Sequence, residues 1–369
     1  MSLALYRKYR PALFEDVLGQ ELIVRILKES AKSNKLAHAY LFSGPRGTGK
    51  TTTARLIAKI ANCEKRQTQK SFAAEGEPCN ACPTCTQIDQ GRSLDVVEID
   101  AASNRGIDEI RNLKESIRLA PASSLNKIFI IDEAHQLTKE AFNALLKTLE
   151  EPPTHVIFVL ATTELDKIPA TILSRTQQFH FKYVPLETIV EKLSHIAHEE
   201  KMNIHHETLE LIAQSGGGSF RDAESLLGQL VATGKKEITT HDVETLIGNV
   251  GFETVARFCE LVLTRNRPDM VKLLSDIEQG GFNLVQFTKD LIEHIRRVAV
   301  LRHSPAMKDV LKRELTGRHL DVLITHTQIF KDSDLGLLKR LISAYSQMRY
   351  SQFPVIPLEI ALLESDEKN

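Results

Sequence analysis

The sequence is poor in cysteine and in long apolar runs, and each shortage excludes a class of protein. Only five cysteines occur in 369 residues, and four of them are clustered. This distribution argues against a disulfide-rich secreted protein and favours a reduced compartment with a bound metal. The longest uncharged apolar run, residues 156–163, is far too short to span a bilayer. Charged side chains throughout residues 1–20 exclude a signal peptide. We therefore expect a cytoplasmic protein without membrane contact.

The chain also lacks net charge, since 47 basic and 48 acidic side chains leave a formal charge of −1. Any contact with nucleic acid must therefore come from a locally arranged basic patch rather than from bulk charge. With 42% hydrophobic residues, the chain can bury substantial cores and form two or three domains.

Residues 36–181 alternate short apolar runs with amphipathic stretches, which predicts an α/β fold with a parallel sheet. Thr51–Ala61 and Thr138–Glu150 have helical periodicity, and Pro152 and Pro153 end the second helix because proline cannot donate to the helical ladder. We expect strands at Ala39–Phe42, Val96–Ile99, Ile128–Ile131, Val156–Ala161 and Gln178–Phe181.

After about residue 184 the pattern becomes wholly helical, and no further strands are expected. Thr240 is a candidate N-cap, and an apolar stripe from Leu284 to Leu301 predicts one long helix that is either core or a subunit interface. Cys259 lies in an apolar helical pattern and is expected to be an inert core residue. The first helices after the sheet are expected at Pro185–Glu200, His206–Gln214, Ser219–Ala232 and Thr240–Asn249.

A cysteine cluster interrupts the α/β pattern at residues 62–90. This segment has no apolar periodicity, so metal binding would supply its folding energy. Its ligands would be Cys63, Cys79, Cys82 and Cys85. Four thiolates suit one tetrahedral Zn²⁺, and a set without histidine or carboxylate indicates a structural metal rather than a catalytic one.

A phosphate-binding loop follows the first expected strand. Residues 44–51 match G-x-x-x-x-G-K-[ST] and open a helix, so backbone N–H groups can wrap phosphates at a helix N-terminus. Lys50 would neutralise the β- and γ-phosphates of ATP, and the Thr51 hydroxyl would ligate Mg²⁺. The expected nucleotide-binding residues are Gly44, Pro45, Arg46, Gly47, Thr48, Gly49, Lys50, Thr51 and Thr52.

Two carboxylates end the buried strand at Ile128–Ile131 and therefore emerge at the carboxyl edge of the sheet, beside the phosphate loop. Asp132 would hold Mg²⁺ through water, and Glu133 would polarise the attacking water as general base. The letters Asp132-Glu133-Ala134-His135 also spell a helicase box, but the chain is short for two motor domains.

The residues after this strand, Thr138 to Pro153, resemble the corresponding helix of clamp-loader ATPases of the AAA+ class. The N-terminal signature Tyr9-Arg10-Pro11-x-x-Phe14-x-x-Val17-x-Gly19-Gln20 and Leu173-Ser174-Arg175 are similar to clamp-loader motifs, with Thr176 in place of the family's cysteine. Together with the cysteine insert, the chain resembles the gamma/tau family of bacterial DNA polymerase III, most densely from residue 6 to about 230.

The resemblance implies further site residues. Arg175 would be an arginine finger that reaches the nucleotide site of a neighbouring subunit. Thr163 would sense the γ-phosphate and orient the water, and Arg221 would reach the γ-phosphate from a helical lid. Arg105 and Arg111 would contact the DNA backbone, where contacts position the protein but do not read sequence.

The resemblance also implies an architecture and partners. We expect an AAA+ domain at 1–184 with a zinc module at about 62–90, a helical lid at 185–249 and an all-α oligomerisation collar at 250–369. Delta- and delta-prime-type subunits would complete a pentameric ring that acts on a sliding clamp and primed DNA beside the polymerase core. No carboxylate set for nucleotidyl transfer is visible. A longer tau-like product with polymerase- or helicase-binding extensions remains open.

Two alternatives to an ATP-driven clamp-loader subunit remain at this point. The chain could be a nucleotide-gated scaffold that does not hydrolyse ATP, although complete motifs at Lys50, Asp132 and Glu133 argue against this. It could also be another AAA+ DNA motor, such as a branch-migration helicase.

Overall fold

The computed structural model describes residues 4–103, 115–248, 250–312, 315 and 317–364. By contacts the chain divides into two compact units, residues 1–237 and 238–369, and each is described by itself. The expected domain boundaries at residues 184 and 249 remain predictions.

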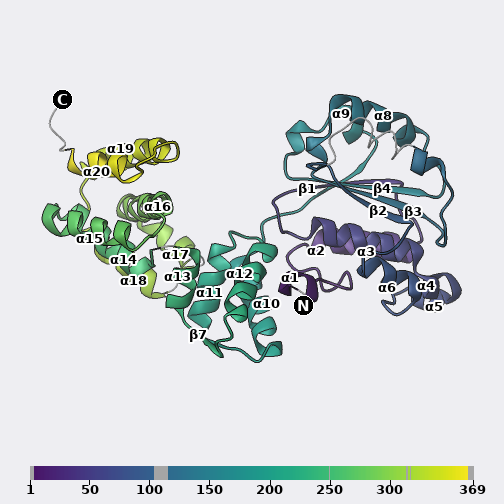
Figure 1. Cartoon of the computed structure of the whole chain (residues 1–369), viewed down its shortest axis with the longest axis horizontal. Coiled ribbons are helices and arrows are strands. Elements are labelled where there is room, and N and C mark those ends of the chain that lie inside the picture. The colour runs from purple at the N-terminus through teal and green to yellow at the C-terminus, as the bar shows by residue number, and fades with distance from the viewer. Residues whose placement is uncertain (1–3, 104–114, 249, 313–314, 316, 365–369) are drawn as a thin grey trace. The chain divides into compact units, whose positions relative to one another are not determined.

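The first unit is built on one five-stranded parallel sheet (Figure 1). Its strand order is β2-β3-β4-β1-β5, so the first strand lies between the fourth and the fifth. All five expected strands are confirmed to within about a residue at each end. The strands are β1 (Ala39–Ser43), β2 (Val96–Asp100), β3 (Lys127–Asp132), β4 (Val156–Thr162) and β5 (Gln177–His180).

Helices cover both faces of this sheet because side chains along each strand alternate between the faces. Tyr40 and Phe42 of β1 pack into a core with α2 (Glu21–Lys32) and α3 (Lys50–Asn62). Ala39 and Leu41 belong to a second core, shared with α8 (Lys139–Glu150) and α9 (Ala170–Leu173). The sheet is therefore the middle layer of an α/β/α sandwich (Figure 1).

Shorter elements complete the first unit. The cysteine segment contains three short helices, α4 (Glu64–Thr68), α5 (Lys70–Ala73) and α6 (Pro83–Asp89). The helical region after the sheet contains α10 (Leu186–Glu199), α11 (His206–Ser215) and α12 (Phe220–Ala232), each close to its expected bounds. The remaining short elements are α1 (Leu5–Lys8), η1 (Ala134–Gln136) and η2 (Leu165–Lys167).

Two expectations for the helical region were wrong in detail. A small two-stranded sheet joins β6 (Asn203–Ile204) to β7 (Glu237–Ile238), although no strands were expected after residue 184. Two-residue strands are too short to leave a periodic pattern in the sequence. The N-cap of α13 (Thr240–Ile247) is Thr239 rather than Thr240, because Thr239 forms a capping box with Asp242.

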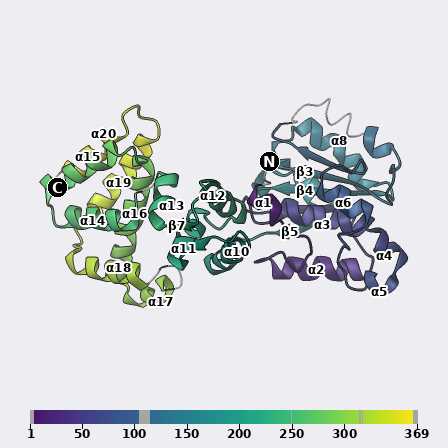
Figure 2. The same ribbon diagram turned by 60° about the horizontal axis from the view of Figure 1, so that its bottom comes forward.

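The second unit is wholly helical in its described residues after β7 (Figure 2). The long helix α16 (Leu284–His303) packs against α14 (Phe252–Leu263), α18 (Gly317–Ile329) and α19 (Asp334–Met348). The predicted apolar stripe along α16 is buried, so its core role is confirmed. The other helices are α15 (Arg267–Gln279), η3 (Pro305–Met307), α17 (Lys308–Leu311) and α20 (Val355–Leu363).

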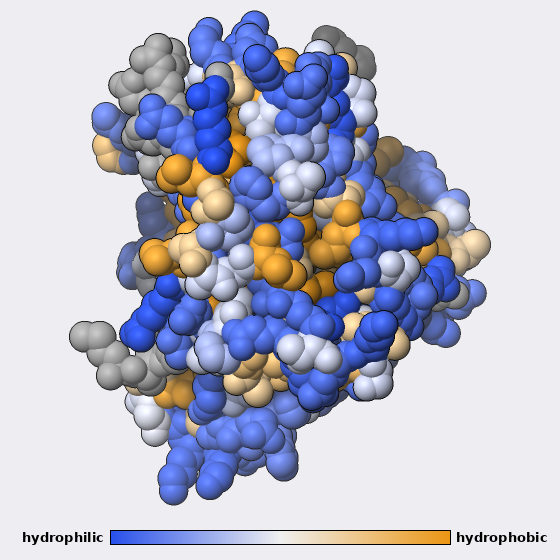
Figure 3. All heavy atoms as spheres, turned by 90° about the vertical axis from the view of Figure 1, so that its right-hand side faces the viewer, coloured by the Kyte–Doolittle hydropathy of each residue, from blue (hydrophilic) through white to orange (hydrophobic). Residues whose placement is uncertain are grey.

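Among the helices of the described ranges, none is both long and apolar enough to cross a membrane. The surface seen in Figure 3 is mostly hydrophilic, with hydrophobic residues gathered across its middle.

Replacing Leu291 by alanine should destabilise the second unit by about 2–5 kcal/mol, because the side chain is fully buried in α16 and truncation leaves a cavity. Leu335→Ala is the matched control, since Leu335 in α19 is 39% exposed and should lose less than about 1 kcal/mol. Urea unfolding followed by circular dichroism measures both, and equal losses would contradict the assignment of α16 as the centre of the core.

Candidate functional site

The loop between β1 and α3 has a backbone that glycine adopts most readily. Gly44, Gly47 and Gly49 have φ angles of 134°, 73° and 104°. A Cβ atom on Gly44 would collide with the carbonyl oxygen of Phe181, and one on Gly47 with the hydroxyl of Ser219. Because glycine has no side chain, the loop can approach these neighbours closely and turn its backbone N–H groups toward a bound phosphate.

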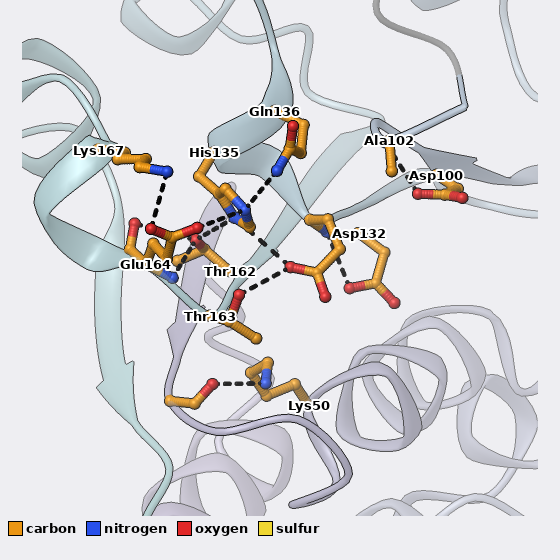
Figure 4. Close-up of polar contacts among 12 residues, drawn as sticks. Lys50, Asp100, Ala102, Asp132, His135, Gln136, Thr162, Thr163, Glu164 and Lys167 are labelled. Atoms are coloured by element: carbon orange, nitrogen blue, oxygen red, sulfur yellow. Dashed lines mark hydrogen bonds and ion pairs between the residues drawn. The ribbon is translucent and has the colours of Figure 1, made fainter. Parts of the chain in front are cut away.

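Lys50 is buried inside this loop, with only 6% of its surface exposed. Its ammonium donates to the carbonyl oxygens of Gly44 at 2.7 Å and Pro45 at 2.6 Å (Figure 4). Burial lowers the pKa of Lys50, and the carboxylates of Glu133 and Asp132 oppose that shift. An anionic phosphate in the loop would further favour the charged ammonium.

The two residues expected to hold Mg²⁺ lie together. Asp132 ends β3, and the Thr51 hydroxyl at the start of α3 donates to its carboxylate at 2.8 Å. A hydroxyl and a carboxylate are the oxygen ligands that Mg²⁺ takes in phosphate sites, so the pair fits this ion.

Glu133 directly follows β3, and its side chain is held by the residue that follows β4. Its backbone is left-handed, with φ of 49°, and Thr163 donates its hydroxyl to the Glu133 carboxylate at 3.1 Å. The expected general base and the expected γ-phosphate sensor are therefore in direct contact.

His135 joins this group, although the sequence singled it out only as part of a helicase box. Its side chain is 4% exposed, and Nδ1 lies 3.1 Å from the Thr162 hydroxyl and 3.5 Å from the Glu133 carboxylate. Nε2 lies 3.1 Å from the carboxylate of Glu164, so the ring spans from η1 to the loop after β4 (Figure 4). Its position two residues after Glu133 was the only sequence signal for this role.

One cavity collects most of the expected residues. Arg46 to Thr52, Asp132, Glu133 and Arg221 all line it. Gly44, Pro45 and Thr163 line a neighbouring hollow instead. Nine further residues line the cavity without a role expected from the sequence, and Arg10, Pro11 and Val17 among them belong to the N-terminal signature. The nine are Tyr6, Arg10, Pro11, Asp16, Val17, Leu18, Lys192, Phe220 and Glu224.

The helical part of the first unit contributes charge to the cavity. The guanidinium of Arg221 lies 5.2 Å from the centroid of the Tyr6 ring. Lys192 in α10 lies 2.8 Å from the carboxylate of Glu224 in α12 and 4.6 Å from the Phe220 ring centroid. Burial raises the pKa of Glu224, and Lys192 opposes the shift.

Arg175 does not line this cavity. Its guanidinium forms an ion pair with Glu150 and donates to the carbonyl oxygen of Thr171 at 2.8 Å. The expected DNA-contact residues Arg105 and Arg111 lie outside the described residues.

The four clustered cysteines come together as expected. One sulfur from each of Cys63, Cys79, Cys82 and Cys85 lies within 4.8 Å of every other, and none forms a disulfide. Burial raises the pKa of Cys63 and of Cys85. Burial acts on Cys79 in the same direction, but hydrogen bonds from the N–H groups of Ala81 and Cys82 and from the Cys63 and Cys82 thiols together lower its pKa to about 7. Four thiolates this close need a cation between them, and the donor set fits Zn²⁺.

A second group of metal-ligand types lies in the core of the second unit. Cys259 is buried as expected and lies with His294 and His326, and their candidate ligand atoms are within 4.8 Å of one another. The two imidazoles satisfy each other, with His294 Nε2 2.9 Å from His326 Nδ1. Burial lowers the pKa of His294 to about 3 and raises that of the Cys259 thiol, so this group is a neutral core cluster.

Known protein families match most of the first unit. A model described as "DNA polymerase III, delta subunit" matches residues 19–185, and one for the ATPase lid domain of the DNA polymerase III clamp loader subunit matches residues 188–236. DNA polymerase III subunit tau of Bacillus subtilis is 39% identical over 98% of this chain and 62% of its own length. Subunit gamma of Buchnera aphidicola is 36% identical over 82% of this chain and 80% of its own length.

The chain belongs to the DNA polymerase III gamma/tau family of clamp-loader subunits. The expected AAA+ fold is confirmed, with its five-stranded parallel sheet, cysteine cluster, helical lid and helical C-terminal region. The Escherichia coli tau subunit is 39% identical over 88% of this chain but only 50% of its own length. The clamp-loader subunit thus spans about half to three fifths of the length of these tau relatives.

Metal analysis of the purified clamp-loader subunit should find about one zinc per chain, because the four thiolates close one tetrahedral site. Replacing Cys82 and Cys85 together by serine should remove it. Cys259→Ser should retain it, whereas two zinc ions per wild-type chain would assign a second metal to Cys259, His294 and His326.

Proposed function

We propose that this chain is an ATP-hydrolysing subunit of a clamp loader that uses ATP to place a sliding clamp on primed DNA. The observation that carries the proposal is the single cavity that collects Lys50, Thr51, Asp132, Glu133 and Arg221. Membership of the gamma/tau family supports the same reading.

The residues have complementary roles in this proposal. The N–H groups of residues 44–52 and the ammonium of Lys50 bind the phosphates, and Arg221 reaches the γ-phosphate from α12. Thr51 and Asp132, whose side chains are in contact, would hold Mg²⁺. The ion neutralises charge on the phosphate oxygens when bound.

Glu133 orients and deprotonates the attacking water, and Thr163 controls when the Glu133 carboxylate is available to do so. The Thr163 hydroxyl donates to Glu133 here, at 3.1 Å. A hydroxyl that turns to the γ-phosphate releases the carboxylate for the water. Binding of the triphosphate and activation of the base are then one event.

Arg175 completes the site of a neighbouring subunit, since it lies outside its own cavity and pairs with Glu150. Hydrolysis then depends on assembly with delta- and delta-prime-type subunits into a pentameric ring, which the second unit joins as a collar. The ring opens the clamp when ATP binds and releases it on primed DNA after hydrolysis, next to the polymerase core. Arg105 and Arg111 contact the DNA backbone, and the four cysteines hold a structural Zn²⁺.

Lys50→Ala should lower ATP turnover of the assembled complex at least ~100-fold, because one buried cation that stabilises the transferred phosphoryl group is lost. Lys35→Ala is the control, since Lys35 is an exposed lysine of the same unit and should leave turnover unchanged. Steady-state phosphate release measures both. Unchanged turnover with Lys50→Ala would favour the non-hydrolysing scaffold.

Arg175→Ala should keep ATP binding but lose roughly 1,000-fold of the DNA- and clamp-stimulated hydrolysis, which is the contribution of an arginine finger supplied by a neighbour. Glu150→Gln separates this role from the local ion pair, because it removes the partner and keeps the arginine. It should retain stimulated turnover. Full-rate hydrolysis by the isolated chain would refute the role of the neighbour.

A further inference from the structure

A buried carboxylate in the cysteine module binds the backbone of the N-terminal segment. Glu77 is 6% exposed and accepts hydrogen bonds from the amides of Phe14 at 2.7 Å and Glu15 at 3.3 Å. The ammonium of Lys28 in α2 lies 2.8 Å from the same carboxylate. Charge-assisted bonds in a buried site are the ones whose loss is costly, so this contact is an anchor.

A second anchor lies within the metal-binding turn itself. Asn80 stands between Cys79 and Cys82, with a left-handed backbone at φ 55°. Its backbone N–H faces the thiol of Cys85, while its side-chain amide donates to the carbonyl oxygen of Ala12 at 3.0 Å. One residue thus joins the metal-binding turn to the N-terminal segment.

The anchored residues do not line the nucleotide cavity themselves, but they lie in sequence between two stretches that do. Residues 10 and 11 line the cavity on one side of the anchors, and residues 16–18 line it on the other. The Asp16 carboxylate also accepts from the amides of Ala12 at 3.3 Å and Leu13 at 3.0 Å, which closes the loop between them. A shift of residues 12–15 would therefore move the cavity-lining residues that precede and follow them in sequence.

The module also packs against α3, the helix that begins at the phosphate loop. Cys63 directly follows α3, and α6, which carries Cys85, packs against α3. Lys59 of α3 has a side chain only 1% exposed and lies 2.8 Å from Asp89 of α6. In Figures 1 and 2, α4, α5 and α6 lie beside α2 and α3. The module therefore contacts both the N-terminal segment and α3, which each carry residues that line the cavity.

We propose that Glu77 and Asn80 are positioning residues through which metal binding at the four cysteines sets the affinity of the cavity for nucleotide. The metal holds the Cys79–Cys85 turn, the turn holds Asn80 and Glu77, and these hold residues 12–15 in the nucleotide-competent arrangement. When the anchors are lost, that arrangement is only fractionally populated, and the apparent affinity falls by the same fraction. The inference rests on the proposed nucleotide site.

The test uses the full chain, a fluorescent ADP analogue to measure affinity, and hydrogen exchange to measure the segment directly. Glu77→Gln should bind the analogue about tenfold more weakly and speed exchange of the Phe14 and Glu15 amides, the loss expected for a charge-assisted hydrogen bond. Asn80→Gly keeps the positive φ and the N–H that faces Cys85, and should weaken binding severalfold. Both variants should keep about one zinc per chain.

Matched controls separate the anchors from general effects of substitution. Glu75→Gln changes an exposed carboxylate two residues away, and Asn34→Gly changes an exposed asparagine with the same φ of 55°. Neither should alter affinity or exchange. Slow exchange of the buried β1 and β4 amides in every variant would show that the fold is intact.

Removal of the metal provides the remaining comparison. Cys82→Ser should lose zinc and reproduce the weaker binding and the faster exchange at Phe14 and Glu15. Wild-type affinity in Glu77→Gln, Asn80→Gly and Cys82→Ser, while the wild type binds the analogue, would overturn the inference. A wild type that binds no analogue would refute the nucleotide site itself, and exchange at Phe14 and Glu15 would still decide whether the module holds the segment.

Discussion

The parallel register of the central sheet is the constraint on which the rest of the site depends. Ser43 pairs with Thr162, and Asp100 pairs with Asp132, so strands separated by many residues end at one edge. The phosphate loop, the two acids and the threonine after β4 all leave the sheet there. Because every strand points the same way, side chains from three segments that are far apart in the sequence meet at this edge.

That edge holds buried charge before any ligand arrives. Lys50 lies against the carbonyls of its own loop, and Lys192 and Glu224 pair beside it. Burial disfavours the charged form of Lys50, and an anion in the loop would favour it. The charge of the cavity suits an anion, and the hydrogen bond from Thr163 fixes the position of the Glu133 carboxylate beside it.

The cysteine module stabilises its surroundings by a different kind of interaction. It has little apolar core of its own, and its contacts with the sheet domain are buried ion pairs and hydrogen bonds from Glu77, Asn80, Lys59 and Arg66. Such contacts are directional, and the loss of one partner is strongly destabilising because the other is left buried without a hydrogen bond. A turn held by a metal would be a suitable support for them because it would fix donors and acceptors rigidly, which is the basis of the proposed link between the module and the cavity.

The sequence alone determined the five strands, the phosphate loop, the acids at the end of β3, the cluster of four cysteines and the buried stripe of α16. Each of these is recorded in consecutive residues, as an apolar run, a helical period or a fixed motif spacing, so local physics suffices to find it. Only the tertiary structure decided the network of His135, the pair of Lys192 and Glu224, the grouping of Cys259 with two histidines, and the anchors at Glu77 and Asn80. These are single polar residues whose partners lie tens of residues away. The sequence pattern around such a residue does not indicate which distant residue it will contact. Burial and hydrogen-bond geometry exist only once distant segments have packed, which is why those contacts had to be seen in the fold.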